Sequence, residues 1–423
     1  MNSIEQRYRA RTAASAAIGA RAARVMPGGD TRSVTYYRPY PLTITRGAGP
    51  FLWDADGNRY IDLLGNYTSL VHGNAYPPIV EAVARVSANG TAWPARNEAQ
   101  IELAELICER VASVERVRMC NSGSEAGMLA AQLSRRVTAR PRLLMARQGY
   151  HGSYDDLEAE WAGEGGRTLL AEYGDASSFE AVLARHGDEI AAVFLEPILG
   201  SSGIVTPPPD FLPRVANAAW RAGALFVIDE VITLRLGLGG AQAAAGITPD
   251  LTMMGKIIGG GLPVGAVGGR AELMAHFDPA GTHAMHHSGT FNGNPLTCAA
   301  GVVSVRELNA ERIATMDLLA ARMQAEMERA ATKLGLPFGI RRAGSLMNVA
   351  FDGAGPGDVH APAARMMENF HLAALNQGLF FAPRGLIVLS TVMTGDLIAE
   401  ICERAAAALA DVAIETNLPG KRI

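Results

Sequence analysis

The stretch DLTMMGKIIGGGLPVGAVGG, residues 250–269, contains two short apolar runs with a lysine and a cluster of glycines between them. Lys256 is one of only three lysines, with Lys333 and Lys421, among 38 basic residues, so arginine carries nearly all of the positive surface charge. Burying an ammonium group without a partner is costly. A lysine in this apolar setting is therefore expected to be there for its amine. A lysine in a surface loop is the alternative that this stretch alone leaves open.

Similar short apolar runs recur from about residue 115 to residue 269, and stretches with helical patterning separate most of them. The run ERVRMC precedes the helical SEAGMLAAQLSRRV, and ALFVIDE follows a helix predicted over 211–222. Strands without polar alternation are typical of a mostly parallel sheet that helices cover on both faces. The pattern therefore predicts an α/β fold built on such a sheet.

The length of the chain predicts more than one domain. At 423 residues it exceeds the size of a typical single core. We predict an N-terminal segment over 1–65, containing a helix and a hairpin around the Asp-Gly pair at 56 and 57. A large domain is predicted over 66–305 and a smaller α+β domain over 306–423. One long helical stretch is predicted from residue 297 to about residue 334.

The composition argues against several classes of protein. A formal net charge of -4 argues against nucleic acid as the main partner. No apolar run reaches the roughly 18 residues that a membrane-spanning helix needs. The four cysteines are scattered and form no CxxC pair, which is typical of a cytoplasmic protein. We therefore expect a cytoplasmic protein.

Three polar features follow predicted strands, where open α/β sheets bind their ligands. NSGSEA follows VRMC, Asp229 follows ALFVI, and Lys256 follows LTMMG. A Gly-Ser turn that opens a helix offers free backbone amides to a phosphate. Asn121 or Ser122 can cap this helix, with Glu125 at the capping-box position, and plain helix capping is the alternative interpretation.

Taken together, these features suit pyridoxal 5'-phosphate. Lys256 is expected to form a Schiff base with the cofactor aldehyde. Asp229 is expected to pair with the protonated pyridine nitrogen, which keeps the ring a strong electron sink. Tyr150, in QGYHGSY, can stack on one face of the ring, and Val231 can cover the other face because it points the same way as Asp229.

With these residues in place, the chain resembles a known family. NSGSEA, YHG, LEP, IDEV, GKIIGGGLPVGA and SGTFNGNP occur in the same order in the class III aminotransferases, which are fold-type I pyridoxal-phosphate enzymes. The resemblance extends over nearly the whole chain and is greatest to the β-amino acid aminotransferase and glutamate-1-semialdehyde aminomutase branch. It implies a mostly parallel seven-stranded sheet in the large domain, with a smaller α+β domain built from the N- and C-terminal segments.

The resemblance also implies roles for individual residues. Gly123 and Ser124 would bind the cofactor phosphate, and Lys256 would also shuttle protons. Thr290, in SGTFNGNP, would reach the phosphate from the partner subunit, which implies a homodimer with shared active sites. The resemblance implies the same contacts with the cofactor ring as given above, from Asp229, Tyr150 and Val231. Glu196 of the LEP motif is left outside the predicted site.

Two arginines bear on the substrate. The resemblance implies that Arg32, in GGDTRSV, clamps a substrate carboxylate. Arg384, in FFAPRG, matches several β-amino acid aminotransferases and not the aminomutase pattern. We therefore predict a ping-pong, Schiff-base transamination between a β-amino acid and a keto acid acceptor. Glutamate-1-semialdehyde 2,1-aminomutase and an amine (omega) transaminase acting on carboxylate-free amines remain the alternatives.

Other kinds of site fit the sequence less well. His283, His286 and His287 have no carboxylate or cysteine beside them, so no metal is expected. A phosphate-binding P-loop fails at Asp250 and Ile257, and no well-placed GxGxxG follows the first strand. A non-catalytic cofactor-binding protein on the same fold is the remaining rival. The intact lysine, aspartate and phosphate loop argue against it.

Overall fold

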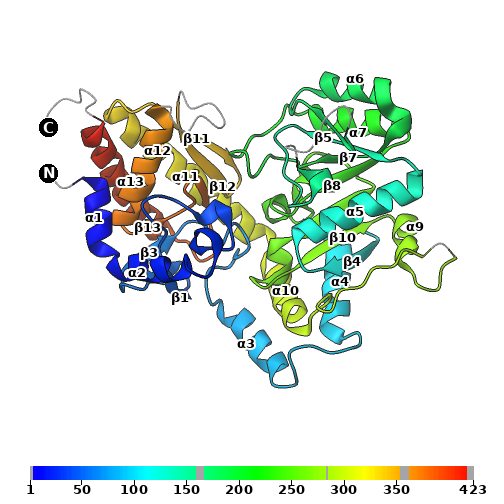
Figure 1. The fold of residues 1–423 in the computed structure, drawn as a ribbon, viewed down its shortest axis with the longest axis horizontal. Coiled ribbons are helices and arrows are strands. Elements are labelled where there is room, and N and C mark those ends of the chain that lie inside the picture. The colour runs from blue at the N-terminus through cyan, green and yellow to red at the C-terminus, as the bar shows by residue number, and fades with distance from the viewer. Residues whose placement is uncertain (1–2, 159–165, 283, 353–361, 417–423) are drawn as a thin grey trace. The chain divides into compact units, whose positions relative to one another are not determined.

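The protein folds into two compact units in a computed structural model (Figure 1). The described residues are 3–158, 166–282, 284–352 and 362–416. The first unit comprises Met1–Tyr67, His72–Tyr76 and Glu311–Ile423, and the second comprises Thr68–Val71 and Pro77–Ala310. The three-part division at 65/66 and 305/306 stays a prediction. None of the helices in the described residues is long and apolar enough to cross a membrane.

A seven-stranded sheet forms the centre of the second unit (Figure 1). Its strand order is β4-β10-β9-β8-β7-β5-β6. β10 is antiparallel to β9 and β4, and the other neighbouring strands are parallel, so the predicted sheet is confirmed. The strands are β4 (Arg116–Cys120), β5 (Arg142–Ala146), β6 (Thr168–Ala171), β7 (Ile190–Leu195), β8 (Leu225–Asp229), β9 (Leu251–Gly255) and β10 (Gly265–Gly269).

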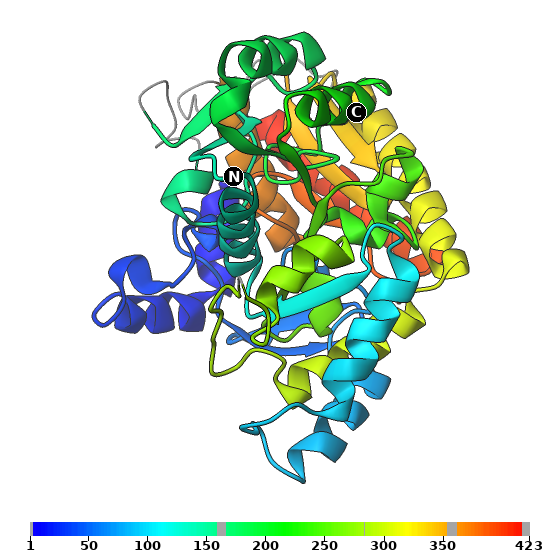
Figure 2. The ribbon, with the colours of Figure 1, turned by 90° about the vertical axis from the view of Figure 1, so that its right-hand side faces the viewer.

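Helices cover both faces of this sheet because successive residues of a buried strand point to opposite faces. Val227 of β8 belongs to the cluster packed against α5, while Phe226 and Ile228 pack with α6 and α7. Figures 1 and 2 show α6 and α7 apart from α5. The helices are α3 (Pro77–Ser87), α4 (Glu98–Arg110), α5 (Gly123–Thr138), α6 (Ala176–His186), α7 (Phe211–Arg221), α8 (Gly240–Ala244), α9 (Ala271–Met274) and α10 (Pro295–Glu307).

The pairing brings six strand ends to one edge of the sheet. β4 is antiparallel to β10, and β10 is antiparallel to β9, so β4 runs in the same direction as β9, β8, β7, β5 and β6. The carboxyl ends of these six strands therefore share an edge. Open α/β sheets bind ligands at this edge.

The first unit contains two smaller sheets with helices packed on them. The strand orders are β1-β2-β3-β13 and β11-β12-β14. β2 and β3 are antiparallel, which confirms the hairpin predicted around the Asp-Gly pair. The strands are β1 (Ile44–Ala48), β2 (Phe51–Asp54), β3 (Arg59–Asp62), β11 (Phe338–Ala343), β12 (Leu346–Phe351), β13 (Leu379–Phe380) and β14 (Leu386–Val388); the helices are α1 (Ile4–Arg11), α2 (Ala13–Ala22), α11 (Ala310–Lys333), α12 (Pro362–Asn376) and α13 (Gly395–Glu415).

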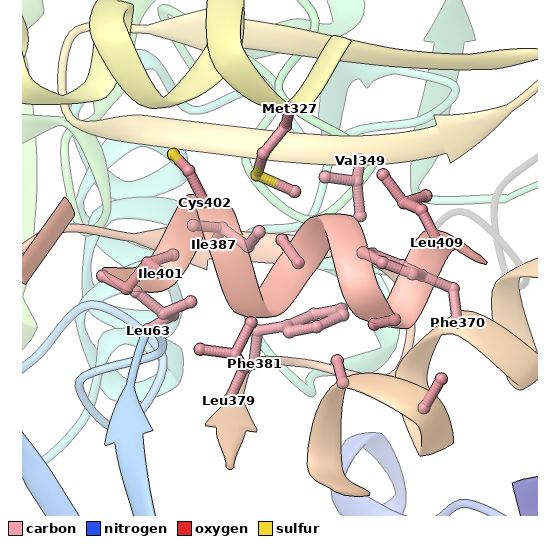
Figure 3. Packing of buried hydrophobic residues seen from close by; sticks show 14 of the residues in the cluster. Leu63, Met327, Val349, Phe370, Leu379, Phe381, Ile387, Ile401, Cys402 and Leu409 are labelled. Atoms are coloured by element: carbon pink, nitrogen blue, oxygen red, sulfur yellow. The ribbon is translucent and has the colours of Figure 1, made fainter. Parts of the chain in front are cut away.

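The core of the first unit lies between these helices and strands. Figure 3 shows Ile401 and Leu409 of α13, Phe370 of α12 and Val349 of β12 pointing into one cluster. Leu63, which follows β3, contributes to the same cluster. The N- and C-terminal segments therefore share one hydrophobic core.

Two helices that were predicted to be continuous are interrupted. The stretch predicted from 297 to 334 forms α10 and α11, and the break at Leu308 lies just before the chain passes from the second unit, which ends at Ala310, to the first. There the Leu308 carbonyl accepts a hydrogen bond from Arg110. The N-terminal helix is two helices, because the Asp56 carboxylate accepts the amides of Ala14 and Ser15 and so caps α2.

A buried histidine in the first core is expected to make the protein sensitive to acid. His371 lies between the rings of Tyr37 and Phe381, with centroids at 4.6 and 5.3 Å, and burial lowers its pKa to about 3. In the unfolded chain the histidine becomes protonated near pH 6.5, whereas in the folded protein it stays neutral down to about pH 3. The free energy of unfolding therefore falls as the pH drops from about 6.5 toward 3. This residue alone should remove about 2 kcal/mol of unfolding free energy between pH 7 and pH 5.

Denaturant unfolding at several pH values would measure this effect. His371→Leu should flatten the acid side of the stability profile, while a substitution of the exposed His286 to leucine should leave it unchanged. Equal pH profiles for the wild type and His371→Leu would contradict the assignment.

Candidate active site

The first part of the site is the amino end of α5, directly after β4. The Ser122 side chain caps the helix by accepting the amide of Glu125, at 3.1 Å. The Glu125 carboxylate in turn accepts the amide of Asn121, at 2.7 Å. The amides of Gly123 and Ser124 lie in the first turn and have no acceptor within the helix. They are available to an anion, as the sequence predicts.

The segments that follow neighbouring strands pack tightly around this helix end. A Cβ atom at Gly123 would lie 3.2 Å from Val231, which therefore packs against the backbone at this point. Gly152, with φ of +118°, approaches so closely that a Cβ atom there would lie 2.5 Å from the Cα atom of Ser124. The Ser124 hydroxyl also accepts the amide of Ser153, at 3.1 Å. The predicted phosphate loop and ring-covering valine thus lie together.

Asp229, at the end of β8, forms a buried pair with a histidine. His151 Nδ1 lies 2.9 Å from one carboxylate oxygen, and the amide of Val231 donates to the other at 3.0 Å. The side chains of Asp229 and His151 are 6% and 0% exposed. Because each oxygen has a hydrogen-bond partner, the carboxylate is held in one orientation. The sequence analysis assigned no role to His151.

Glu196, at the end of β7, is a second buried carboxylate beside this pair. It accepts the amide of Tyr150 at 3.0 Å and that of Gly200 at 2.9 Å. Burial raises its pKa, the charge of His151 opposes this rise, and the charge of Asp229 adds to it. Glu196 therefore fixes the backbone of Tyr150, whose side chain remains half exposed.

Lys256 follows β9 with a left-handed φ of +48°. Burial lowers the pKa of its amine, while the negative charges of Asp229 and Glu196 oppose that shift. No carboxylate in the described ranges lies within ion-pair distance of the amine. A partly buried lysine without an ion pair is suited to act as a nucleophile or a proton carrier.

Thr290 also belongs to the second unit but lies in the exposed loop before α10. The same loop is attached to the start of α5 by a hydrogen bond from Asn121 to Asn292, at 2.8 Å. Its neighbour Phe291 is 59% exposed. The structure of one chain thus places Thr290 on the surface of a loop that contacts the start of α5 in the same chain.

The two arginines predicted to bind substrate belong to the first unit. The side chains of Arg32 and Arg384 are exposed. Burial raises the pKa of Tyr67, and the charges of both arginines oppose that rise, so both lie near this phenol. Within the described part of the chain, neither guanidinium has a carboxylate partner.

The histidine-rich loop offers little to a metal. His283 lies outside the described residues, and His286 is exposed. The ring of His287 accepts a hydrogen bond from Arg118 at 3.0 Å. Among the residues that the structure describes, no cluster of three histidines, cysteines or carboxylates could hold a metal ion.

The residues at the carboxyl edge of the second unit fit pyridoxal 5'-phosphate. They supply free amides at a helix end, a buried carboxylate, an aromatic and a branched side chain, and an unpaired amine. A family model described as aminotransferase class-III matches residues 33–159 and 169–409. The chain belongs to the class-III aminotransferases. It is therefore a pyridoxal-phosphate enzyme and a transaminase by family.

Known transaminases and an aminomutase resemble the chain over most of its length. The β-phenylalanine transaminase of Variovorax paradoxus is 39% identical over 385 residues, which covers 88% of this chain and 87% of the relative. A glutamate-1-semialdehyde 2,1-aminomutase of Rhodopirellula baltica is 38% identical over 376 residues, covering 83% and 85%. A solved transaminase with pyridoxal phosphate bound has a TM-score of 0.91 and 33% identity, covering 96% and 99%. The predicted family branch is thereby confirmed.

Proposed function

We propose that this class-III aminotransferase moves an amino group between a β-amino acid and a keto acid acceptor in a ping-pong reaction. The observation that supports it best is the pair of cations, Arg32 and Arg384, near one phenol and without carboxylate partners in the described residues. Guanidinium groups bind carboxylates through two parallel hydrogen bonds. A substrate acid and a dicarboxylate acceptor would use both groups, whereas a plain amine would use neither.

The residues of the second unit have distinct proposed roles toward the cofactor. Bound pyridoxal phosphate supplies an electron sink that stabilises negative charge on the substrate carbon bearing the amine. Gly123 and Ser124 bind the phosphate, and Tyr150 and Val231 cover the two faces of the ring. Asp229, held by its histidine partner, ion-pairs with the ring nitrogen.

Lys256 has two proposed tasks. Its Nζ atom would hold the cofactor through the aldehyde in the resting enzyme. During turnover the same atom, once released, would take the proton from the substrate carbon that bears the amine and deliver it to the cofactor carbon that carried the aldehyde. The lowered pKa of the amine favours the neutral form that both tasks require.

The aminomutase and the amine transaminase remain alternatives. The Rhodopirellula relative carries the aminomutase name at nearly the same identity as the Variovorax transaminase. An aminomutase keeps both amino groups on one substrate through the cycle, so it needs no external acceptor. A spectroscopic screen of half-reactions with β-amino acids, α-amino acids, plain amines and glutamate 1-semialdehyde separates the three. Efficient 5-aminolevulinate formation would favour the aminomutase.

Arg32→Ala should selectively impair acids. Losing a charged bidentate partner costs roughly 2–4 kcal/mol, which lowers kcat/KM for the β-amino acid by about 30- to 1000-fold. A carboxylate-free amine should be affected less than threefold. Steady-state kinetics with both substrates measure this, with Arg38→Ala, another exposed arginine of the same segment, as control. Conversion of amines but not β-amino acids by the wild type would overturn the proposal.

We further propose that the working unit is a homodimer in which Thr290 binds the cofactor phosphate of the partner subunit. A groove of about 780 Å³ along edge strand β4 and the loop at 287–293 supports this, since it leaves Ile101 exposed on its lining. Exposed apolar side chains beside an edge strand, whose outer backbone groups have no neighbouring strand, mark a surface for another protein.

Thr290→Ala should weaken cofactor retention. A hydrogen bond to a charged phosphate contributes roughly 1.5–3 kcal/mol, so the dissociation constant should rise about tenfold to a hundredfold. Equilibrium dialysis of the cofactor, with sedimentation to establish the dimer, measures both parts of the proposal. An active monomer with full cofactor occupancy would contradict it.

The four free cysteines fit a cytoplasmic location, which we also propose.

A further inference from the structure

The first unit contains a strained turn beside Arg32. Gly65, Asn66 and Tyr67 have φ angles of +53°, +47° and +55°. Glycine adopts this left-handed backbone readily and asparagine tolerates it, but it is unfavourable for a bulky residue such as tyrosine. Strain of this kind persists only where surrounding contacts enforce it, and it concentrates at functional sites. The turn therefore calls for a functional explanation.

A buried carboxylate fixes the entry into this turn. Asp62, at the end of β3, accepts the amides of Leu64 and Gly65 at 3.0 and 2.9 Å. Its other oxygen accepts the side-chain amide of Asn74, at 2.8 Å. Because Asp62 is only 5% exposed, these bonds hold the backbone in one conformation.

The same turn contacts Arg32 from two sides. The guanidinium donates from Nη1 to the side-chain oxygen of Asn66 at 2.8 Å, and its carbon lies 5.7 Å from the ring centroid of Tyr67. The Tyr67 hydroxyl donates to the carbonyl of Val34 at 2.7 Å. The turn thus holds both the charged group and the backbone that carries it.

The backbone around Arg32 is also fixed by its own segment. The Asp30 carboxylate accepts the amides of Thr31 and Arg32, at 2.6 and 3.3 Å, and the hydroxyl of Thr35, at 2.5 Å. Asp30 lies near the guanidinium but does not pair with it at ion-pair distance. The exposed side chain of Arg32 is therefore held at its guanidinium by the turn and at its backbone by Asp30.

The two groups that hold the guanidinium are electrically neutral. The amide oxygen of Asn66 and the ring face of Tyr67 attract a cation without cancelling its charge. A carboxylate in either place would compete with an incoming acid. A long arginine side chain also loses rotamer freedom when it binds, and orienting it beforehand reduces that cost.

We propose that Asn66 and Tyr67 are positioning residues that orient the Arg32 guanidinium without neutralising it and thereby set the preference for carboxylate-bearing ligands. The inference rests on the proposed role of Arg32 in binding the substrate carboxylate. The strained turn is the means by which a tyrosine ring and an amide oxygen reach the same guanidinium.

Two substitutions of Asn66 separate positioning from folding. Asn66→Asp and Asn66→Gly both tolerate a left-handed φ, so the turn is retained. Asn66→Asp keeps an acceptor but adds a competing charge, and Asn66→Gly removes the acceptor and adds none. The probe is 3-phenylpropanoate, an acid without an amine, titrated into the holoenzyme by calorimetry. The midpoint of thermal unfolding is recorded for each variant.

We expect the dissociation constant of 3-phenylpropanoate to rise at least tenfold in Asn66→Asp and threefold to tenfold in Asn66→Gly, with unfolding midpoints within 2 °C of the wild type or higher for glycine. Tyr67→Phe, which keeps the ring and loses the bond to Val34, should show a rise of about threefold. Arg32→Ala is the reference for complete loss of the contact.

The outcomes distinguish the two proposals. If Arg32→Ala weakens binding and Asn66→Asp stays within twofold of the wild type, the positioning inference is wrong and the role of Arg32 stands. If the wild type does not bind the acid, or Arg32→Ala binds it equally well, both proposals fall. If Asn66→Gly loses binding only together with a lower unfolding midpoint, the turn has a structural role and the inference is wrong.

Discussion

Lys256→Ala is expected to lower kcat by at least about 10³-fold while the protein remains folded. The amine is the proposed attachment point of the cofactor and the group that moves the substrate proton, and proton transfer by a positioned side chain alone contributes roughly 10²–10⁴-fold. The side chain forms no ion pair within the described residues, so its removal leaves no buried charge uncompensated. Single-turnover kinetics of the reconstituted variant measure the loss.

The scarcity of lysine makes the control unusually clear. Borohydride reduction of the holoenzyme followed by peptide mapping should place the phosphopyridoxyl mass on Lys256. Lys333→Ala, at the exposed end of α11, should keep full activity. Lys421 lies outside the described residues, but its peptide is resolved in the same map. A label on either of these two lysines would show that the assignment is wrong.

The parallel strands of the second unit could be predicted because buried strands leave unbroken apolar runs in the sequence. The direction of β10 could not be read from its run, since an apolar run has no polarity. The length of the connection between β9 and β10 does indicate the direction, because the link from Gly255 to Gly265 is too short for the crossover that a parallel pair needs. The break at Leu308 was missed because it reflects the passage between two units, which local helix propensity does not encode.

Residues of the candidate site could be proposed from the sequence where they directly follow strands, but not where a partner comes from a distant segment. His151 stands next to Tyr150 in the sequence, yet its contact with Asp229 joins residues 78 apart. A general rule could have found it, because a carboxylate buried at a strand end requires a donor. The partners of Arg32 carry no such signal. Gly65 and Asn66 are compatible with a left-handed turn, but nothing in GNYT predicts that it continues through Tyr67 and Thr68, because tyrosine and threonine disfavour that backbone and only the tertiary contacts enforce it.

Asp229→Asn should have the second largest effect, because it removes a charge and keeps the shape. The asparagine can still accept the amide of Val231, but it cannot neutralise a protonated ring nitrogen, and it places a neutral amide beside His151 in place of the carboxyl group. Breaking a buried charged pair costs about 3–5 kcal/mol, which corresponds to roughly 10²–10⁴-fold in kcat. Cofactor affinity, measured by dialysis, should fall as well.

A matched control separates the loss of this charge from general damage to the sheet. Asp250 is another buried aspartate, placed at the amino end of β9, where it accepts the amide of Phe226 and pairs with Arg270. Asp250→Asn should lower the free energy of unfolding and leave kcat within about threefold, because it lies at the opposite edge from Lys256. Asp229→Asn should also lower the free energy of unfolding, but it should lower kcat far more, by the roughly 10²–10⁴-fold given above. If the two variants lost activity equally, the electrostatic role of Asp229 would be refuted, since a buried carboxylate anywhere in the sheet would then have the same effect.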